Sequence, residues 1–375
     1  MDNSSRLFSP LRLGKCQLRH RVAMSPLTRF RADDLSVQVP FAKEYYAQRA
    51  SVSGTFLVSE ATSISRESVG FSNVPGIWNA EQVRAWREIA DHVHSKGSFL
   101  FLQLWATGRS ATPERLQSGD FDFASSSAVP MEPGGAVPRE LTEEDIQSLI
   151  AGFAEAARRA IDAGMDGVEL HAANGYLIDQ FTQASCNQRK DKWGGSIENR
   201  ARFAIEVTRS VVAAVGADRV GVKLSPWGKI QGMGTMQDLV PQFRYLVSGL
   251  RGLGLAYLRL SNSRWIDGIP QEEEDNSIYV HTWGASRPVL LEGGYDPISA
   301  QEEVDMRFKG YDVVIAFGRF FISNPDLPFR IKADIDLQKY NRDTFYTPIS
   351  EKGYIDYPFS TAFLEEHSSE ASLKL

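Results

Sequence analysis

The sequence is poor in cysteine and histidine, and this scarcity excludes several kinds of site. Cys16 and Cys186 are the two cysteines among 375 residues, and they lie too far apart to form a metal-binding or redox motif. We therefore expect two reduced thiols, as is usual in a reducing compartment. The six histidines include no HExxH pair and no Cys/His cluster, so we expect no metal site. A serine-hydrolase elbow of the form GxSxG is missing too.

Long apolar runs and nucleotide-binding glycine motifs are also missing. No apolar run reaches the roughly 18 residues that a membrane helix needs, and the N-terminus lacks the basic and apolar regions of a signal peptide. The sequence has neither a GxGxxG turn nor a Walker lysine loop. A net charge of −6 argues against nucleic acid or an anionic membrane as a partner. We expect a cytoplasmic protein that acts on a small molecule.

What is present is a regular alternation of short apolar runs and amphipathic stretches. Eight runs rich in Val, Leu, Ile and Phe are typical of strands buried on both faces, and they cover residues 21–26, 55–62, 98–105, 166–173, 219–226, 256–262, 288–294 and 312–318. Helical periodicity occupies residues 79–95, 142–163, 198–215, 236–251 and 297–308. Thr142 and Ser196 are predicted to cap two of these helices. Eight repeats of strand and helix favour a closed (β/α)8 TIM barrel over an open doubly wound sheet.

The chain shows no shift in composition that would divide it into several domains. We expect a single barrel domain over residues 1–362 and a weakly ordered tail over residues 363–375. Two connections, 106–141 and 263–287, are longer than a barrel needs. In a barrel such insertions after strands lie over the C-terminal mouth, where binding and catalytic groups gather.

Glycines follow the last two predicted strands. Gly293 and Gly294 come after the seventh strand, and Gly318 and Arg319 come after the eighth. Glycine lets backbone N–H groups approach an anion closely, and the loops after strands seven and eight form the usual phosphate site of a barrel. These residues predict a bound phosphate, although glycine also follows strands simply to allow a turn.

Three polar side chains follow the fourth predicted strand. An imidazole at His171 and an amide at Asn174 are two donors that can converge on one carbonyl oxygen and stabilise the charge that develops there. The phenol of Tyr176, two residues on, is a competent general acid when it is placed in line. A lone histidine at a strand end is more often a structural residue, but three such groups within six residues favour a catalytic site.

Several longer segments resemble the old yellow enzyme family of flavin oxidoreductases. The most specific are HAANGYLIDQF at 171–181 and DKWGGSIENRARF at 191–203. Further matches are PLTRFRA at 26–32, QLWATGR at 103–109, KLSPWG at 223–228 and FGRFFISNPDLPFR at 317–330. The resemblance covers about residues 6 to 360, and within the family the chain is similar to the fungal branch, especially the ergot-alkaloid enzymes that act on chanoclavine-I aldehyde.

The resemblance implies an ene-reductase with FMN as cofactor and NADPH as reductant. Its substrate would be an α,β-unsaturated aldehyde or ketone of fungal secondary, alkaloid-type metabolism, which receives hydride at the β-carbon. Family members occur as monomers and as homodimers, so either state is expected here.

The resemblance also assigns roles to individual residues. The residues expected to contact the flavin ring are Pro26, Thr28, Ala61, Gln103 and Lys223, and those expected to hold its phosphate are Gly293, Gly294, Gly318 and Arg319. His171 and Asn174 would bind the carbonyl oxygen of the substrate, and Tyr176 would protonate its α-carbon. Trp105 and Tyr346 would shape the substrate pocket. Many relatives carry Arg in place of Lys223 and Gly in place of Ala61, so the flavin potential and the space beside the ring are expected to differ.

Three other functions are also compatible with the sequence. A flavin-dependent isomerase would give hydride to the alkene and take it back, a flavin-binding barrel could act as a non-catalytic partner, and an aldolase-type barrel for phosphorylated sugars would need no flavin. Tyr176 favours the reductase. In the ergot-related branch, tyrosine at this position accompanies net reduction and phenylalanine accompanies isomerisation.

Overall fold

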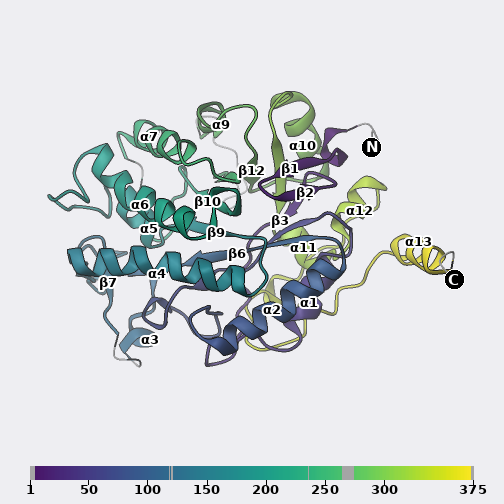
Figure 1. The fold of residues 1–375 in the computed structure, drawn as a ribbon, viewed down its shortest axis with the longest axis horizontal. Helices are drawn as coiled ribbons and strands as arrows, with labels where there is room; N and C mark the ends of the chain where they lie inside the picture. The colour runs from purple at the N-terminus through teal and green to yellow at the C-terminus, as the bar shows by residue number, and fades with distance from the viewer. Residues whose placement is uncertain (1–4, 118, 120, 235, 264–273, 373–375) are drawn as a thin grey trace.

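The centre of the computed structural model, which describes residues 5–117, 119, 121–234, 236–263 and 274–372, is a closed barrel of eight parallel strands (Figure 1). In barrel order the strands are β3 (Val22–Met24), β4 (Phe56–Val58), β6 (Phe99–Trp105), β9 (Gly167–Ala172), β10 (Val220–Leu224), β11 (Tyr257–Ser261), β12 (Val289–Glu292) and β13 (Val313–Phe317). Pairing of β13 with β3 closes the ring, and the short β5 (Thr62–Ser63) extends the pairing with β6. The predicted TIM barrel and all eight predicted strands are confirmed.

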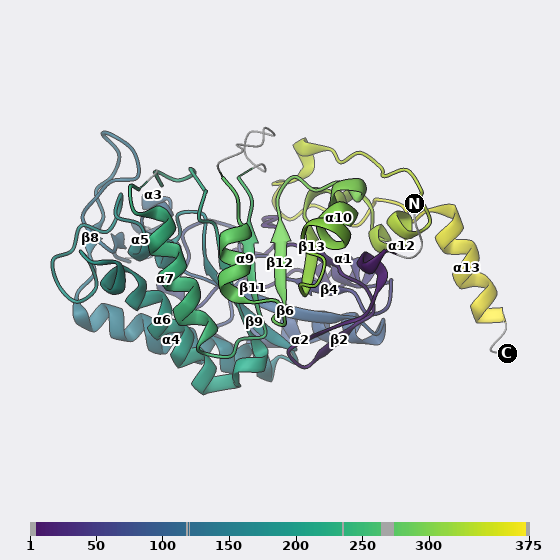
Figure 2. The ribbon, with the colours of Figure 1, turned by 90° about the horizontal axis from the view of Figure 1, so that it is seen from above.

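Helices surround the barrel on its outer side (Figure 2). The helices are α1 (Ala42–Arg49), α2 (Ala80–Ser95), α3 (Pro113–Gln117), α4 (Glu143–Asp162), α5 (Leu177–Thr182), α6 (Ile197–Val215), α7 (Leu239–Arg251), α9 (Ser277–Trp283), α10 (Pro297–Glu302), α11 (Arg319–Ser323), α12 (Leu327–Lys332) and α13 (Thr361–Ser372). The five predicted helices correspond to α2, α4, α6, α7 and α10, and α10 continues directly into a π-helical turn, η5 (Glu303–Arg307). No described helix combines the length and the apolar character that crossing a bilayer requires.

The predicted helix caps are present. Thr142 accepts a hydrogen bond from the backbone N–H of Asp145, whose side chain accepts in return from the backbone N–H of Thr142, which is a capping box at the start of α4. Ser196 accepts from the backbone N–H of Asn199 at the start of α6. These caps satisfy N–H groups that would otherwise have no partner in the first turn of each helix.

An antiparallel hairpin that the sequence did not predict closes the N-terminal end of the barrel. Its strands are β1 (Leu11–Leu13) and β2 (Cys16–Leu18). The apolar side chains of the hairpin pack against the inward-facing residues at the strand starts, among them Phe56, Phe101 and Tyr257. The ring of Tyr257 packs directly against Gly221 on the neighbouring strand. A Cβ at position 221 would lie 2.2 Å from the phenol ring, so a larger residue would not fit. The half of the barrel interior next to the strand starts is therefore packed with apolar side chains. The polar groups lie in the other half, toward the C-terminal ends of the strands.

The two insertions follow strand ends, as expected. The connection 106–141 contains α3 and the short parallel pair β7 (Ala124–Ser125) and β8 (Arg139–Glu140). In the connection 263–287 the structure has helix α9, so part of this expected insertion is one of the barrel helices. Residues 264–273, which include most of the acidic run QEEED, lie outside the described residues.

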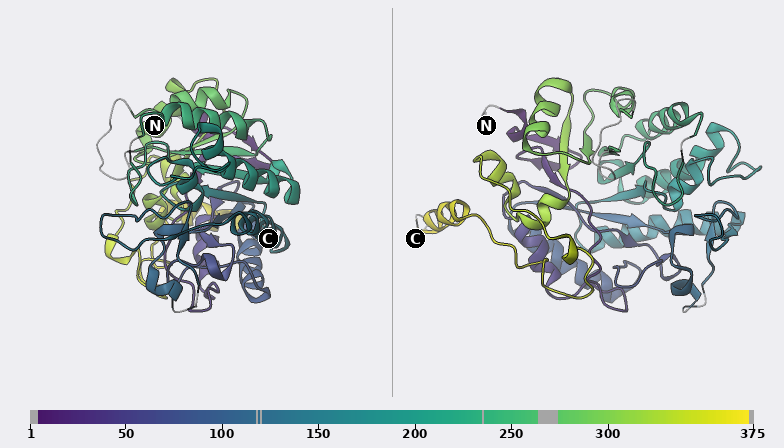
Figure 3. Two further views of the ribbon diagram at one scale, coloured as in Figure 1. Left: turned by 90° about the vertical axis from the view of Figure 1, so that its left-hand side faces the viewer. Right: turned by 180° about the vertical axis from the view of Figure 1, so that it is seen from behind.

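The C-terminal tail contains a helix that the sequence did not predict. The structure has a helix, α13, that begins at Thr361, before the expected boundary, and projects from the body of the molecule (Figure 3). Its first turn is fixed because the Oγ of Ser360 donates to the carboxylate of buried Asp326 over 2.6 Å, and because Phe363 stacks on Phe359. No local pattern indicates this anchor, because Asp326 is 34 residues away from Ser360.

Candidate active site

The three predicted catalytic residues lie together at the C-terminal end of β9. The ring of Tyr176 stands edge-on to the imidazole of His171, with ring centroids 4.8 Å apart and an interplanar angle of 78°. Between them, Asn174 has a left-handed backbone with φ +59°, which asparagine tolerates better than most residues. Its N–H donates to the Oγ of Ser225 over 2.7 Å and so joins this turn to the end of β10. The structure thus brings His171, Asn174 and Tyr176 to one place.

Two side-chain atoms of this group are buried and have no hydrogen-bond partner in the described part of the chain. They are Nδ1 of His171 and Oδ1 of Asn174. Buried polar atoms nearly always have a partner, so these atoms indicate a polar ligand. A half-turn of the amide exchanges its oxygen and nitrogen, and the same position then presents an NH2 donor. The pair fits a carbonyl oxygen as its ligand.

Burial also sets the protonation states of the group. It holds the pKa of His171 well below 6.5, and the nearby charge of Lys223 adds to this effect, so the imidazole is neutral near pH 7. Burial raises the pKa of Tyr176 above 10, so the phenol keeps its proton. A neutral imidazole and a protonated phenol are the forms that the predicted roles require.

An aromatic wall continues outward from Tyr176. Trp105 stands edge-on to Tyr176 at a centroid distance of 4.8 Å, and Phe71 stacks on Trp105 at 5.7 Å. Phe30 links Phe71, at 6.4 Å, to Tyr346, at 5.6 Å. Tyr346 is 61% exposed and forms the outer end of the wall. Sequence reasoning named Trp105 and Tyr346 but missed Phe30 and Phe71, which connect them.

Two buried arginines bring Tyr346 to the mouth. Arg29 donates through Nε to the backbone oxygen of Phe345 over 3.0 Å, and Arg31 donates to the same oxygen over 2.8 Å. Arg31 also donates to the backbone oxygen of Thr344. Both arginines follow β3 directly, so the segment that carries Tyr346 is held against the first strand of the barrel.

The residues predicted to contact the flavin ring lie on or just after the strands β3, β4, β6 and β10. Pro26 and Thr28 follow β3 and are half-buried, and Ala61 lies in the same buried cluster as Trp105. Gln103, on β6, is buried and donates through its amide nitrogen to Glu169 over 2.7 Å.

The predicted phosphate residues lie where β12 and β13 end. Gly293 and Gly294 have φ values of +100° and +78°, and a Cβ on Gly293 would lie 3.0 Å from the backbone oxygen of Asn262. Glycine is therefore required at position 293 for both conformation and space. Gly318 precedes α11, and Arg319 begins that helix with its guanidinium near the hydroxyl of Tyr340, 3.4 Å away. Left-handed glycines, a helix start and a guanidinium make a cradle that suits a phosphate.

Sequence reasoning named Lys223 but missed that it belongs to a set of four charged side chains inside the barrel. We call it the inner charge cluster, and it consists of Glu169, Lys223, Arg259 and Glu292. Arg259 donates to Glu169 over 2.6 Å and to Glu292 over 3.2 Å, and the Nζ of Lys223 lies 2.6 Å from Glu292. All four are buried. The signal in the sequence was a charged residue within an otherwise apolar strand, as in the segments VELHA, VKLS, LRLS and LLEGG.

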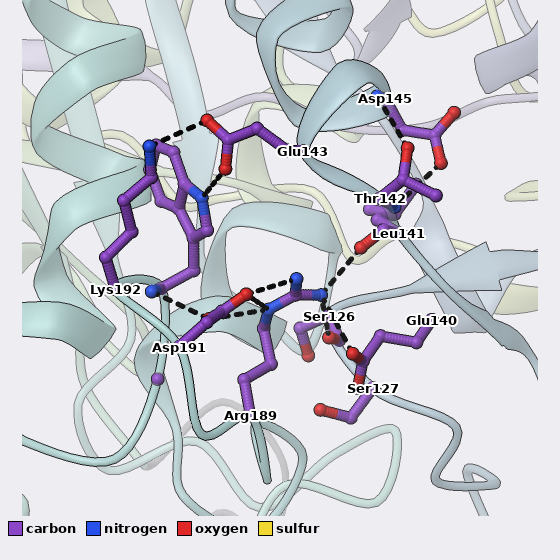
Figure 4. Close-up of polar contacts among 12 residues, drawn as sticks. Ser126, Ser127, Glu140, Leu141, Thr142, Glu143, Asp145, Arg189, Asp191 and Lys192 are labelled. Carbon is purple, nitrogen blue, oxygen red and sulfur yellow. Dashed lines mark hydrogen bonds and ion pairs between the residues drawn. The ribbon is translucent and has the colours of Figure 1, made fainter.

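A further buried arginine ties the 106–141 insertion to the loop before α6. Figure 4 shows Arg189 pointing at the insertion, where it donates to the backbone oxygens of Ser126, over 3.0 Å, and Leu141, over 2.7 Å. It also forms an ion pair with Asp191. Nearby, the indole N–H of Trp193 donates to Glu143 at the start of α4. Arg189 and Trp193 thus tie the C-terminal part of the insertion and the start of α4 to the loop before α6.

Comparisons with known proteins agree with this geometry. Residues 6–338 match the NADH:flavin oxidoreductase / NADH oxidase family. The chain is 94% identical to the aldehyde reductase FrzD of a Cladobotryum species over all of both chains. It is 58% identical to the chanoclavine-I aldehyde reductase ifgG of Penicillium roqueforti, over 96% of this chain and 97% of that one. The crystal structure of Old Yellow Enzyme from Pichia sp. AKU4542 superposes with a TM-score of 0.89 and 36% identity, over 96% of this chain and 95% of that one. The chain therefore belongs to the NADH:flavin oxidoreductase family, in its old yellow enzyme branch, and FMN is its cofactor.

Proposed function

We propose that the protein reduces the C=C bond of an α,β-unsaturated aldehyde or ketone, with NADPH as the reductant. The observation that carries the proposal is the grouping of His171, Asn174 and Tyr176 at one strand end, with two buried polar atoms that lack a partner in the described chain. The names of the relatives at 94% and 58% identity, both aldehyde reductases, support the choice of an aldehyde.

Each residue has a separate task in this proposal. Reduced FMN, held in this site, would be the source of the hydride that the β-carbon of the alkene accepts. His171 and Asn174 bind the carbonyl oxygen and stabilise the negative charge that grows on it, an effect typically worth a few kcal/mol per donor. The hydroxyl of Tyr176 gives its proton to the α-carbon. We propose that Gln103 and Lys223 bind the flavin ring and that Gly293, Gly294, Gly318 and Arg319 bind its phosphate.

The aromatic wall limits what the site accepts. Trp105, Phe71, Phe30 and Tyr346 form a row of ring faces and edges on one side of the mouth. A flat or ring-bearing aldehyde would bury apolar surface against this row, at roughly 25 cal/mol per Å² of area removed from water. We propose that small unbranched enals bind more weakly than ring-bearing ones.

The two buried cysteines fit a cytoplasmic location. Cys16 and Cys186 are both free and buried, and burial raises the pKa of each thiol, which keeps it in the unreactive protonated form. We propose that the protein functions in the reducing cytoplasm.

The isomerase is the alternative that must be separated experimentally. A reductase consumes one NADPH for each saturated product, whereas an isomerase makes product without net consumption. Purified protein, NADPH and a ring-bearing enal should give saturated aldehyde and oxidised nicotinamide in equal amounts. Product that accumulates while NADPH stays constant would establish the isomerase instead.

A further inference from the structure

The inner charge cluster contains equal numbers of positive and negative groups. Lys223 and Arg259 carry two positive charges, and Glu169 and Glu292 carry two negative charges. The four residues come from consecutive strands, β9 to β12, so they form a belt around part of the barrel interior. In surroundings of low dielectric constant, a single uncompensated charge in such a belt has a large effect on its neighbours.

Glu292 is the centre of the cluster. Its Oε1 lies 2.6 Å from the Nζ of Lys223 and accepts from the Oγ of Ser261 over 2.6 Å. Its Oε2 accepts from Arg259 over 3.2 Å and from the Oγ of Ser25 over 2.9 Å. Burial alone would raise the pKa of Glu292, but the charges of Lys223 and Arg259 and the hydrogen bond from Ser261 lower it to about 2 and keep the carboxyl ionised. Glu292 therefore both fixes the position of Lys223 and cancels its charge.

Two residues that the proposed function assigns to the flavin belong to the cluster or contact it. Lys223 is one, and the other is Gln103, whose amide nitrogen donates to Glu169 over 2.7 Å. In between, Arg259 has one guanidinium nitrogen, Nη2, that is buried and has no partner in the described part of the chain. The chain of contacts thus runs from the amide of Gln103 through Glu169, Arg259 and Glu292 to the ammonium of Lys223.

We propose that Glu292 sets the redox potential of the bound flavin, by cancelling the charge of Lys223 and so leaving the inner charge cluster with no net charge. Reduction adds negative charge to the flavin, and a cationic neighbour favours the reduced form. With Glu292 present, the potential stays lower than Lys223 alone would make it. This inference rests on the proposed function only for the position of the flavin beside Lys223.

Charge counting orders the potentials of three variants. Glu292→Gln leaves the cluster at +1, Lys223→Met leaves it at −1, and the double variant returns it to zero. We expect Glu292→Gln to raise the reduced-to-oxidised ratio at least tenfold at a fixed dye potential, which is about 30 mV for a two-electron couple. We expect Lys223→Met to lower the ratio by a similar factor and the double variant to lie near the wild type.

The measurement is an equilibration of the FMN-loaded protein with a reference dye, without any enal. Ser261→Ala is the control, because it removes one hydrogen bond to Glu292 but no charge, and its ratio should change less than threefold. A Glu292→Gln protein with an unchanged or lower ratio would overturn the proposal. So would a double variant that does not return toward the wild type.

Two further outcomes are also decisive. Removing Glu292 alone leaves Lys223 buried without its counter-ion, which is destabilising. If that variant does not fold, Lys223→Met and the double variant still decide, because the proposal requires the double variant to have the higher potential. Enal turnover by the wild type is scored separately. A wild type that binds FMN and shows these shifts but reduces no enal would disprove the proposed function while supporting this inference.

Discussion

The imidazole of His171 and the phenol ring of Tyr176 lie edge to face, with centroids 4.8 Å apart, although one residue ends a strand and the other precedes a helix. The left-handed turn at Asn174 makes this possible, because it reverses the chain within three residues. Two groups with different tasks, one that polarises an oxygen and one that donates a proton, are thereby held on one rigid scaffold.

Replacing the Tyr176 hydroxyl should separate the two halves of the reaction. The variant Tyr176→Phe keeps the ring contact with His171 but has no proton to give. We expect alkene saturation to slow by about 10² to 10⁴-fold, the usual contribution of a general acid. NADPH oxidation by a quinone or by oxygen should be nearly unchanged, and both rates are measurable by NADPH absorbance.

Tyr245→Phe is the matched control, since Tyr245 is exposed on α7. Its two rates should equal those of the wild type. Equal loss of both half-reactions in Tyr176→Phe would show that Tyr176 is not the proton donor.

Substitution of Gly293 should weaken FMN binding. A Cβ at this position would press on the backbone oxygen of Asn262 and occupy the cradle, so we expect Gly293→Ala to raise the FMN dissociation constant at least tenfold, about 1.4 kcal/mol. Gly310→Ala is the control, because Gly310 has a similar φ of +98° but open space around its Cβ. Fluorescence quenching of free FMN measures both. Equal weakening in the two variants would point to backbone strain rather than the cradle.

Buried His20 should make stability fall in mild acid. Burial lowers its pKa from 6.5 to about 4, so the unfolded chain binds the proton more readily than the folded protein does. The free energy of unfolding should fall as the pH decreases from about 6.5, and the full loss of about 3 kcal/mol should be reached just below pH 4.

The comparison that isolates this effect is the difference between the wild type and His20→Gln at each pH. Thermal unfolding between pH 7 and pH 4 should show the stability of the two proteins converging as the pH falls. A difference for His20→Gln that does not change with pH would mean that His20 is not kept neutral by the fold.

Arg189 should stabilise the 106–141 insertion and protect it from proteolysis. Arg189→Leu leaves the backbone oxygens of Ser126 and Leu141 without their buried donor, which we expect to cost about 3 kcal/mol and to speed proteolytic cleavage within the insertion. Arg139→Leu, in the same insertion, removes exposed ion pairs and should change stability by at most about 1 kcal/mol. Limited proteolysis and thermal unfolding test this pair, and similar behaviour of the two variants would contradict the role of Arg189.

Much of the fold was predictable because barrel strands and helices carry local patterns. The eight apolar runs and the capped helices at Thr142 and Ser196 are recognisable within ten to twenty residues of sequence. The grouping of His171, Asn174 and Tyr176 was predictable for the same reason, since all three lie in one short segment.

The rest depends on contacts between distant segments. The aromatic wall joins Phe30, Phe71 and Tyr346, and no pattern near any of them names the others. The inner charge cluster pairs Arg259 with Glu169, 90 residues apart, across a barrel whose register the sequence does not contain. Each charge alone in an apolar strand signalled a buried partner without identifying it.

The most direct test of the central claim is the absorbance spectrum of the FMN-loaded protein under anaerobic conditions. We expect a yellow protein that NADPH bleaches and that a ring-bearing α,β-unsaturated aldehyde recolours, with one equivalent of saturated aldehyde formed. A protein that stays colourless when FMN is supplied, or a bleached protein that oxygen recolours and no such aldehyde does, would contradict it.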